Sequence, residues 1–547
     1  MKYLLIVSLC LFFALSNKAH SDCKNVLELK YVSSFEKIWD DTRSGAIFNV
    51  AIYKPIAPAG YFPLAYIAFG PYEYPTKVED RAVLVARSDD PTALRQPKDY
   101  KFIGDDSNSG AYKDLSWWQP IPEPGYKCLG SVFVPYHGKP SADSIMCVRE
   151  DLTVPASTGK FLYADRASGG NYDLTIFEVV PYSELPSYNV GAIVAYPGHV
   201  RGSPPKYPSR NSNFPLYTLK AMKTAEDNQD QCALTSPSTS PPTSPPTSKL
   251  TYADIQKIIE KEGPILYLHP QEIYFPSTVE YFLDNAILIK DNFRKVIDYN
   301  SFPIEVQKLG NDSNLFLDVN DPKILLGNLS SAKSYLFIKN VSNQFTDLQF
   351  WFFYPHNGKP FISYRAYIKL LQSSYDRYVG AVNNGEHVGD WEHVTLRVEN
   401  KIKKVVASAF TSHGDTVWYR KDSGNSSDSD EHLKVYSALH MHGNYPEAQQ
   451  YYELASWNDS KFVEFALYSK NNCGQGISWS AFKNYQLLSF DSEKSKNFSW
   501  VDYKGNWGPK QLKKDSIPFQ IAGITFYTFN YESMSEGPAG PNAYSYE

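Results

Sequence analysis

The feature that most constrains the fold of this chain is a segment that occurs three times near its N-terminus. Each copy begins with Asp and carries Ser-Gly three residues later, at Asp41-Thr-Arg-Ser44-Gly45, Asp106-Ser-Asn-Ser109-Gly110 and Asp165-Arg-Ala-Ser168-Gly169. The serines are 65 and 59 residues apart (109 − 44 and 168 − 109). Short runs of alternating apolar and polar residues follow, which is the pattern of half-buried strands. Three copies of a strand-rich unit predict an all-β module with threefold pseudosymmetry.

The number of strands in one unit decides between the all-β architectures. A unit of roughly 60 residues has room for about four short strands, and three four-stranded units around an axis describe a β-prism. A β-trefoil, which has shorter units, is the second choice, and a β-sandwich is the third. Modules of these kinds bind ligands at their surface more often than they catalyse reactions, so we expect a lectin-like binding domain rather than an enzyme.

Composition narrows the classes of partner. The net charge of −5 over 547 residues gives no support for nucleic-acid binding or for a broad basic membrane patch. Aromatic residues make up 15% of the chain and include 41 Tyr, which suits β-strands and surfaces that bind sugars or proteins. A chain of this length exceeds the size of one hydrophobic core, which predicts two domains.

Two segments of unusual composition set the domain boundaries. Residues 1–21 hold an apolar stretch that is too short to span a bilayer and end in a small-x-small sequence, so we predict a secretory signal peptide. Residues 235–248 contain only Thr, Ser and Pro, which cannot form a core and predict an extended, O-glycosylated linker. The predicted domains are therefore residues 22–234, the repeat domain, and residues 249–547.

A signal peptide implies a secreted, extracellular protein or, alternatively, one in the endolysosomal lumen. Both compartments permit N-glycosylation and disulfide bonds. Six Asn-x-Ser/Thr acceptor sequences all follow the linker, which predicts that the second domain is the more heavily glycosylated. The six acceptors are Asn311, Asn328, Asn340, Asn425, Asn458 and Asn497.

Five cysteines follow the predicted signal peptide, and four of them precede the linker. We expect disulfides between Cys128 and Cys147, within the repeats, and between Cys23 and Cys232, at the ends of the first domain. Four cysteines allow three pairings, so the sequence alone leaves this choice open. Cys473 would then be a free or intermolecular thiol.

The second domain opens with a helix and continues mostly as strands. Thr251 is a suitable N-cap, Ile255, Ile258 and Ile259 form an apolar stripe, and Gly263-Pro264 ends the helix. The apolar and alternating runs that follow predict a β-sandwich with few helices.

Histidine and acidic residues concentrate in one segment of this second domain, Glu386-His-Val-Gly-Asp-Trp-Glu-His393. Residues two apart on a strand face the same side, so Asp390 and Glu392 would point together, with His387 on the loop before them. Imidazole and carboxylate groups suit Mg²⁺, Ca²⁺, Mn²⁺ or Zn²⁺. Three ligand types within six residues therefore favour a divalent-metal site over separate structural roles.

Other histidines are candidates for ligand binding. His440 and His442 would face the same side of a strand, and His413 lies in a Ser-His-Gly-Asp sequence. A single His near a strand end is more often a hydrogen-bonding group than a ligand, so this second interpretation stays open. His269 and His356 lie in turn-like contexts, and we expect structural roles for both.

The aspartates of the three repeats are a further set of candidates. Asp41, Asp106 and Asp165 begin loops at the ends of the repeats, where they could contact a ligand. Asp also favours turns because its side chain bonds nearby backbone groups. The two interpretations explain these positions equally well.

Three common enzyme motifs are absent from the sequence. It has no Gly-x-Ser-x-Gly elbow, no Gly-rich phosphate loop followed by Lys-Ser/Thr, and no His-Glu-x-x-His. An acid–base pair, such as Glu392 with His413 around a metal-bound water, is still chemically possible.

The second domain contains four further motifs: Phe352-Phe-Tyr-Pro-His-Asn-Gly358, Gly389-Asp-Trp-Glu-His393, Ser412-His-Gly414 and Gly505-Asn-Trp-Gly508. These motifs resemble the family named after vacuolar protein sorting protein 62, which is widespread in plants and fungi, and the resemblance covers most of residues 265–510. The repeats, where Tyr or Trp-x-Pro-Ile is followed by Gly-Tyr, resemble the N-terminal half of that family. Biochemical function in the family is poorly defined, so this resemblance implies a fold rather than a mechanism.

A second, more distant resemblance implies a mechanism. His387-Val-Gly-Asp-Trp-Glu392 is similar to the Gly-His-Arg-His-Asp-Trp-Glu heptapeptide of necrosis- and ethylene-inducing-like proteins. Those are secreted cytolysins with an actinoporin-like β-sandwich, and they bind sphingolipid head groups with a divalent metal. The resemblance implies metal roles for the His, Asp and Glu of this segment, a loop ligand at Asn357, and a metal-adjacent or head-group role for His413. Gly389 stands where that family has a second His.

Together these features predict a secreted, all-β protein in which a β-prism-like repeat domain is joined to a metal-binding β-sandwich. We expect it to bind glycans or glycosphingolipids on cell surfaces, with peripheral membrane contact and no nucleic-acid partner. The sandwich would then perturb the membrane, as a toxin or defence protein does. Two alternatives stay open: a metal-dependent hydrolase, and a non-lytic luminal sorting or adhesion protein.

Overall fold

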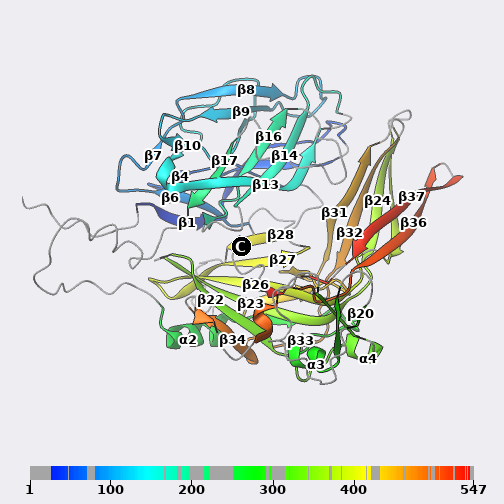
Figure 1. Cartoon of the computed structure of the whole chain (residues 1–547). Coiled ribbons are helices and arrows are strands. Elements are labelled where there is room, and N and C mark those ends of the chain that lie inside the picture. Colours follow the sequence, from blue (N-terminus) through cyan, green and yellow to red (C-terminus); the bar gives the residue numbers. More distant parts are fainter. Residues whose placement is uncertain are drawn as a thin grey trace, which may run out of the picture.

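The computed structural model shows two β-rich domains that pack against each other (Figure 1). The N-terminal domain, in blue to cyan, lies above the C-terminal domain, in green to red. The all-β class is confirmed, since strands make up nearly all elements of the described residues. No helix among those residues has the length and apolar character needed to cross a membrane.

The structure describes residues 26–46, 48–69, 81–165, 168–181, 187–197, 215–220, 250–290, 295–296, 315–319, 321–342, 344–368, 373–383, 385–413, 415–420, 432–459, 463–490, 493–494, 499–503, 505–521, 524–535, 537–538 and 540–541.

Some predicted features lie outside the described residues and stay predictions. They are the signal peptide, the linker, the Cys23–Cys232 disulfide and the glycosylation sites Asn311, Asn425 and Asn497.

In its described residues, the first domain holds six strands in each of the first two repeats and five in the third, where about four were predicted. The strands are β1 (Glu28–Val32), β2 (Phe35–Asp40), β3 (Ala51–Pro55), β4 (Phe62–Pro63), β5 (Ile67–Phe69) and β6 (Val83–Arg87), then β7 (Leu94–Arg95), β8 (Asp99–Asp105), β9 (Ser116–Ile121), β10 (Tyr126–Lys127), β11 (Val132–Val134) and β12 (Cys147–Arg149), and finally β13 (Thr153–Ala164), β14 (Leu174–Pro181), β15 (Ser187–Tyr188), β16 (Ile193–Pro197) and β17 (Leu216–Lys220). Repeat 1 forms the sheets β2-β3-β5 and β1-β6-β4, and repeat 2 forms β8-β9-β11 and β7-β12-β10. In repeat 3 the long strand β13 joins both sheets into β15-β17-β13-β14-β16. Several of these strands have only two or three residues, and an alternating pattern in the sequence cannot reveal a strand that short.

The repeated Asp-x-x-Ser-Gly loops have the same internal hydrogen bonds in all three copies. The Oδ1 atoms of Asp41, Asp106 and Asp165 each accept from the backbone N–H nine residues later, at 3.1, 2.7 and 2.9 Å. The glycine four residues after each Asp has φ of +72°, +75° and +75°, a conformation that favours glycine. The sequence repeat therefore encodes one loop structure built three times.

Neighbouring loops are also joined to each other. The Tyr112 N–H donates to the Thr42 carbonyl, and the Asn171 N–H donates to the Ser107 carbonyl, both at 2.9 Å. These two bonds are equivalent. In each, the donor lies six residues after the loop Asp of its own repeat, and the acceptor lies one residue after the loop Asp of the preceding repeat. The loops of the three repeats therefore gather at one end of the domain.

The disulfide between Cys128 and Cys147 is confirmed, with its Cα atoms 4.2 Å apart. It lies within repeat 2, at β12 and just after β10. Cys473 is a buried free thiol, which is one of the two states expected for it.

The second domain is built around a seven-stranded sheet in the order β28-β27-β26-β23-β22-β34-β35. Its strands are β22 (Ser334–Asn340), β23 (Phe345–Asn357), β26 (His387–Glu399), β27 (Lys404–Ser412), β28 (Asp415–Arg420), β34 (Tyr485–Phe490) and β35 (Glu493–Lys494). The smaller sheets β30-β29-β18-β33, β25-β24-β32-β31, β20-β19-β21 and β36-β37 surround it. These use β18 (Ile265–Tyr267), β19 (Ala286–Lys290), β20 (Lys295–Val296), β21 (Leu315–Val319), β24 (Phe361–Ile368), β25 (Ser373–Ala381), β29 (Lys434–Ser437), β30 (Asn444–Tyr445), β31 (Gln450–Asp459), β32 (Val463–Asn472), β33 (Ser478–Trp479), β36 (Gln511–Ile521) and β37 (Ile524–Ser535).

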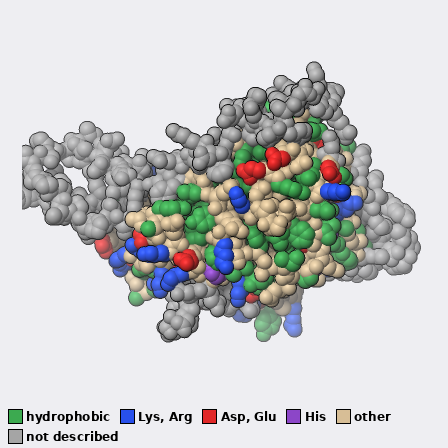
Figure 2. All heavy atoms as spheres, turned by 90° about the horizontal axis from the view of Figure 1, so that it is seen from below, with side chains coloured by type: hydrophobic (Ala, Val, Ile, Leu, Met, Phe, Trp, Pro, Cys, Tyr) green, Lys and Arg blue, Asp and Glu red, His purple; other side chains and the backbone are tan. Residues whose placement is uncertain are grey.

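The helices lie on the side of the second domain that faces away from the first (Figure 1). The predicted helix α2 (Tyr252–Glu262) begins with a capping box at Thr251 and ends at Gly263, as its sequence signals indicated. Two shorter helices, α3 (Val279–Leu283) and α4 (Pro322–Leu325), follow. Figure 2, which views the molecule from this side, shows Lys and Arg side chains interspersed with hydrophobic and acidic ones rather than forming a broad basic patch.

Both faces of the seven-stranded sheet are covered by hydrophobic residues. On one face, Phe350 and Phe352 of β23 pack in a core shared with α2. On the other face, Trp351 and Phe353 pack in an aromatic core with Trp391 of β26. Successive residues of a strand face opposite sides of the sheet, and both sides are covered here. A polar side chain in the middle of these strands is therefore buried on either face.

The two domains are joined through a buried ion pair. Arg397 of β26 donates two hydrogen bonds to Asp347 of β23, both at 2.7 Å, and both side chains are buried. Arg397 also donates to the hydroxyl of Tyr31 in the first domain and lies 4.2 Å from the ring centre of Trp418. Hydrophobic clusters contain residues of both domains, so the repeat domain and the second domain share core.

Candidate functional site

The segment with the predicted metal ligands lies at the start of β26, against the end of β23. Asp390 is opposite Tyr354 and Glu392 is opposite Phe352 in the antiparallel register, so the two carboxylates share a face of the sheet, as expected. Trp391 between them belongs to the aromatic core on the other face. The carboxylates are therefore held in place by the core packing of the residue between them.

Gly389, where the cytolysin heptapeptide has a second His, is required here by the backbone. Its φ is +66°, and a Cβ atom at this position would lie 2.4 Å from the carbonyl oxygen of Trp507. Both facts exclude a larger residue. This departure from the heptapeptide thus reflects local packing beside Asp390.

His442 and Asp390 form the best-defined polar pair of the site. The Nδ1 atom of His442 lies 3.0 Å from Oδ2 of Asp390, and the imidazole is fully buried. The ring of Tyr354 stacks on it, with centroids 3.7 Å apart and planes 6° from parallel. The other nitrogen, Nε2, has no hydrogen-bond partner within the described part of the chain. A buried imidazole fixed by a carboxylate, with its second nitrogen available, is the arrangement that orients a histidine toward a metal or a ligand.

The expectation that His440 and His442 lie side by side on a strand is wrong. Strand β29 ends at Ser437, and the two histidines have φ of +67° and +57°, which belongs to a turn. The backbone N–H of His440 donates to Oε2 of the buried Glu272 at 2.6 Å, while the His440 ring contacts Tyr274. The turn sends the two side chains to different partners.

Asn357 and His387 face each other at the edge of the site, since they are paired in the β23–β26 register. The Asn357 side chain donates to the carbonyl of Gly385 at 2.8 Å, and its Oδ1 has no partner among the described residues. Nδ1 of His387 lies 2.8 Å from the carbonyl oxygen of Gly389. One polar atom of Asn357 is thus used for structure and one is available.

His356, which we expected to be structural, belongs to the same cluster. It is buried, its Nε2 lies 3.5 Å from Oε1 of Glu386, and its Nδ1 has no hydrogen-bond partner in the described residues. Burial lowers the pKa of His356 to about 4, so the ring is neutral and able to accept at neutral pH. The sequence around His356 resembles a turn, but strand β23 continues through it to Asn357. The sequence therefore did not indicate that His356 belongs to this cluster.

A second group of polar residues surrounds Glu392. Thr411 donates to Oε2 of Glu392 at 3.3 Å. Burial, and then the negative charge of Asp390, raise the pKa of Glu392 well above its usual range. Beyond it, the buried carboxylate of Glu453 accepts from Tyr445 at 2.7 Å and lies 3.7 Å from Nε2 of His413. The same nitrogen lies closer, at 3.1 Å, to the amide oxygen of Asn471, so His413 contacts two residues, Asn471 and Glu453, that the sequence pattern did not single out.

The predicted metal ligands are not assembled as a compact set. Among the described residues, the set of three or more His, Cys, Asp or Glu whose ligand atoms all lie within 4.8 Å of one another is Asp106, Asp114 and His137 of the first domain. His387, Asp390 and Glu392 are near one another in sequence but their ligand atoms do not converge. A cation bound there would have to draw the side chains together.

The repeat aspartates are engaged in loop structure, which matches the turn-forming interpretation. Each has one carboxylate oxygen bonded to a backbone N–H. Asp106 also has His137 Nε2 at 2.8 Å. These bonds leave less of each carboxylate for a ligand than the sequence alone suggests.

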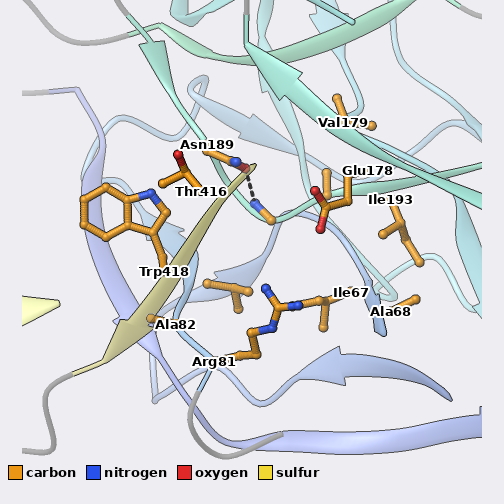
Figure 3. A pocket seen from close by; sticks show the side chains of 13 residues that line it. Ile67, Ala68, Arg81, Ala82, Glu178, Val179, Asn189, Ile193, Thr416 and Trp418 are labelled. Carbon is orange, nitrogen blue, oxygen red and sulfur yellow. Dashed lines mark hydrogen bonds between the residues drawn. The ribbon is translucent and has the colours of Figure 1, made fainter. Parts of the chain in front are cut away.

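A cavity of about 40 Å³ lies at the seam between the domains (Figure 3). The side chains of Arg81 and Glu178 extend into it from the first domain, and Trp418 of β28 lines it from the second. This volume holds water rather than a sugar or lipid head group. The candidate site is therefore the polar cluster around Asp390 and His442.

Comparison with known proteins agrees with the motifs described above. A putative vacuolar protein sorting-associated protein, TDA6, of Saccharomyces cerevisiae is 25% identical over 312 residues, which are 48% of this chain and 62% of that protein. Vacuolar protein sorting-associated protein 62 of the same yeast is 21% identical over 341 residues, 53% of this chain and 65% of that protein. The chain thus matches less than two thirds of the length of these relatives.

Two solved structures have limited similarity to this chain. The crystal structure of GNIP1Aa from Chromobacterium piscinae has a TM-score of 0.32 and 19% identity, covering 38% of this chain and 40% of that one. Necrosis and ethylene inducing protein 2, from the causal agent of cocoa's witches' broom disease, has a TM-score of 0.17 and 16% identity, covering 33% and 74%. Scores this low support no inference about function.

The family relationship rests on a match that spans nearly the whole chain. The model of the family described as vacuolar protein sorting-associated protein 62 matches residues 22–518. This range includes the threefold repeats as well as the second domain. The expected resemblance is thereby confirmed, and the chain belongs to the vacuolar protein sorting-associated protein 62 family.

Proposed function

We propose that this protein binds glycans or glycolipid head groups, and that the polar cluster of the second domain holds a divalent cation that contacts the bound head group. The observation that carries the proposal is the buried His442, whose Nδ1 is fixed by Asp390 and whose Nε2 has no partner in the described residues. A buried polar atom without a partner costs free energy, so a structure that keeps one has a reason to do so. A bound ligand supplies that reason.

The donor chemistry of the cluster suits a divalent cation. Asp390 and Glu392 offer carboxylate oxygens on one face of the sheet, His442 offers an oriented imidazole nitrogen, and Asn357 offers an amide oxygen. Oxygen donors with one imidazole suit Mg²⁺, Ca²⁺, Mn²⁺ or Zn²⁺. The cation would add a positive charge that binds an anionic or hydroxyl-rich head group, and these side chains would hold and orient it.

The proposal is tested by calorimetric titration of the chain from residue 22 with Ca²⁺, Mg²⁺, Mn²⁺ and Zn²⁺. We expect binding of at least one cation, and a loss of 10- to 100-fold in its affinity in Asp390→Asn, because the variant no longer orients His442 as a carboxylate does. Asp114→Asn is the matched control, since it removes an acidic group from the other histidine–carboxylate set. Equal affinity in wild type and Asp390→Asn would contradict the proposal.

Membrane perturbation is the second part of the proposed function, and it is tested separately. Vesicles with and without glycosphingolipid are loaded with a dye, and leakage is measured with the wild type and with Asp390→Asn. If this protein perturbs membranes through the cation site, we expect the wild type to release dye from glycosphingolipid vesicles and Asp390→Asn to release much less. Binding without leakage would instead favour a non-lytic sorting or adhesion protein.

The non-lytic alternative is favoured by the relatives, whose names associate them with vacuolar protein sorting. Such a protein would act in the vacuolar or endolysosomal lumen rather than outside the cell. Localisation of the tagged chain distinguishes the two compartments. Retention in an endolysosomal compartment supports sorting, and appearance in the medium supports secretion.

The hydrolase alternative is favoured by the two carboxylates of β26. Burial and then the charge of Asp390 raise the pKa of Glu392, which favours a proton on this carboxyl group and suits a general acid beside a second carboxylate. Turnover of a glycan or phosphodiester substrate that is lost in Glu392→Gln, while cation binding persists, would identify an enzyme.

A further inference from the structure

The outer face of the sheet β8-β9-β11, in repeat 2, carries a cluster of aromatic side chains. Phe102 and Trp118 are paired across β8 and β9, with ring centroids 5.1 Å apart. Tyr172, from the loop of repeat 3, adds a third ring 5.4 Å from Phe102. Phe102 is 39% exposed and Tyr172 is 42% exposed. Single exposed aromatic residues are common on protein surfaces, whereas aromatic rings that gather into one contiguous patch mark a candidate binding site.

The pseudosymmetry shows that this exposure is particular to repeat 2. The equivalent pair in repeat 3, Phe161 and Phe177, also has its rings in contact, 5.9 Å apart, but Phe177 is fully buried in a core of the molecule. In repeat 1 the equivalent of Phe102 is Lys37. Phe102 is therefore exposed in repeat 2, whereas its counterpart in repeat 3, Phe161, is half-buried against the core.

A chain of polar groups borders the aromatic cluster. The Asn108 amide donates to the Asn171 side-chain oxygen at 2.9 Å, and the Asn171 amide donates to the Ser107 hydroxyl at 3.2 Å. The Ser107 hydroxyl in turn donates to Asp105 at 2.5 Å. Asn171 directly precedes Tyr172, so this chain lies beside the rings. Because the side chains are already held in place, a ligand that bonds to them has less conformational entropy to remove.

We infer that this surface, formed by Phe102, Trp118 and Tyr172 with the Asn108–Asn171–Ser107–Asp105 chain at its edge, is a carbohydrate-binding site of the first domain. The inference rests on the glycan-binding part of the proposed function and gives it a location. It places glycan contact on the aromatic surface rather than on Asp41, Asp106 and Asp165, whose carboxylates bond their own loops.

A carbohydrate fits this combination better than an apolar partner does. The C–H bonds on one face of a sugar ring carry partial positive charge and pack on the negative face of an aromatic ring. The hydroxyl groups at the edge of the same sugar need donors and acceptors, and the bordering amide, hydroxyl and carboxylate groups supply both kinds. A hydrophobic peptide would cover the rings but would leave these polar groups without water or partners, at a cost in affinity.

The test measures retention of the chain from residue 22 on beads that each carry one immobilised sugar: galactose, glucose, mannose or N-acetylglucosamine. We expect retention on at least one bead type and a loss of at least tenfold in apparent affinity in Phe102→Ala and in Tyr172→Ala. Tyr112→Ala is the matched control, because this tyrosine is 68% exposed on a neighbouring loop but contacts Arg43 rather than the aromatic cluster. The control should stay within twofold of the wild type.

The same assay separates this inference from the cation site of the second domain. Asp390→Asn should retain sugar binding, since it leaves the first domain unchanged. Thermal unfolding confirms that each variant is folded, and Asn171→Ala provides a second probe that removes no ring. Wild-type retention that is unaffected by Phe102→Ala and Tyr172→Ala, or absence of wild-type retention on every bead type, would overturn the inference, while the calorimetric test of the cation site would be unaffected.

Discussion

The loops of the first domain and the polar cluster of the second use the same residue types in opposite ways. In the loops, Asp41, Asp106 and Asp165 each accept a backbone hydrogen bond, so the buried polar groups of the loop satisfy one another. In the cluster, Asp390 fixes one nitrogen of His442, and the other nitrogen is buried without a partner in the described residues.

This contrast separates structural from functional polar residues on physical grounds. A polar side chain that completes the hydrogen bonds of its own loop contributes to stability. A buried polar atom without a protein partner lowers stability unless a water or a ligand bonds to it. Substitutions in the loops should therefore reduce stability, and substitutions in the cluster should reduce binding.

The largest effect is expected from replacing all three loop aspartates by alanine. Each replacement leaves a backbone N–H without its acceptor, which costs about 1–2 kcal/mol, so the triple variant should lose about 3–6 kcal/mol of unfolding free energy if the three loops contribute independently. Denaturant unfolding measures this. The triple asparagine variant is the matched control, since it keeps an acceptor oxygen at each position. If alanine and asparagine variants were equally stable, the loops would not owe their stability to these bonds.

A second expected effect concerns the Cys128–Cys147 disulfide, which reinforces the same domain. The two cysteines are 19 residues apart, and closing a loop of this size stabilises a protein by about 3 kcal/mol. Replacing both by serine should lower the unfolding free energy by about that amount. A reducing agent should destabilise the wild type more than the variant, which keeps the predicted Cys23–Cys232 bond, and an equal effect on both proteins would contradict this.

The cluster should show the opposite behaviour, with stability that depends on its ligand. A cation that binds only the folded state stabilises it by about 2.7 kcal/mol at a concentration 100 times its dissociation constant. We therefore expect the cation to raise the melting temperature of the wild type but not of Asp390→Asn, and a chelator to reverse the change. Without cation the two proteins should melt at similar temperatures, because the variant leaves the core of β26 intact. A large loss of stability in Asp390→Asn without cation would make this aspartate structural, like those of the loops.

Sequence patterns predicted the two regions to different extents. The loops were recognisable because a repeat displays the same requirements three times, and Gly45, Gly110 and Gly169 mark the positive φ that the loop needs. The alternation around Trp391 correctly placed Asp390 and Glu392 on one face. These are local properties, and local properties are visible in a sequence.

The rest of the cluster could not be predicted, because its contacts join residues far apart in the chain. The partner of Asp390 is 52 residues away, and Glu453 is 40 residues from His413 (453 − 413). The positive φ of His440 and His442 also broke the strand pattern on which their pairing was predicted, since non-glycine residues seldom adopt it. Long-range topology and an uncommon turn thus determine which residues the site brings together.

The smallest predicted effect is a pH dependence in the first domain. Burial raises the pKa of Asp41 to about 6, above the value of about 3.9 in an unfolded chain. Between about pH 4 and pH 6 the folded state therefore holds this proton more tightly than the unfolded state does, so this group stabilises the fold less as pH rises. Asp41→Asn keeps the acceptor for the Val50 N–H and does not ionise. Its stability relative to the wild type should thus be higher at pH 7 than at pH 4, by about 2 kcal/mol. Unfolding curves of both proteins at the two pH values measure this difference, and a difference that does not change with pH would mean that Asp41 is ionised at both.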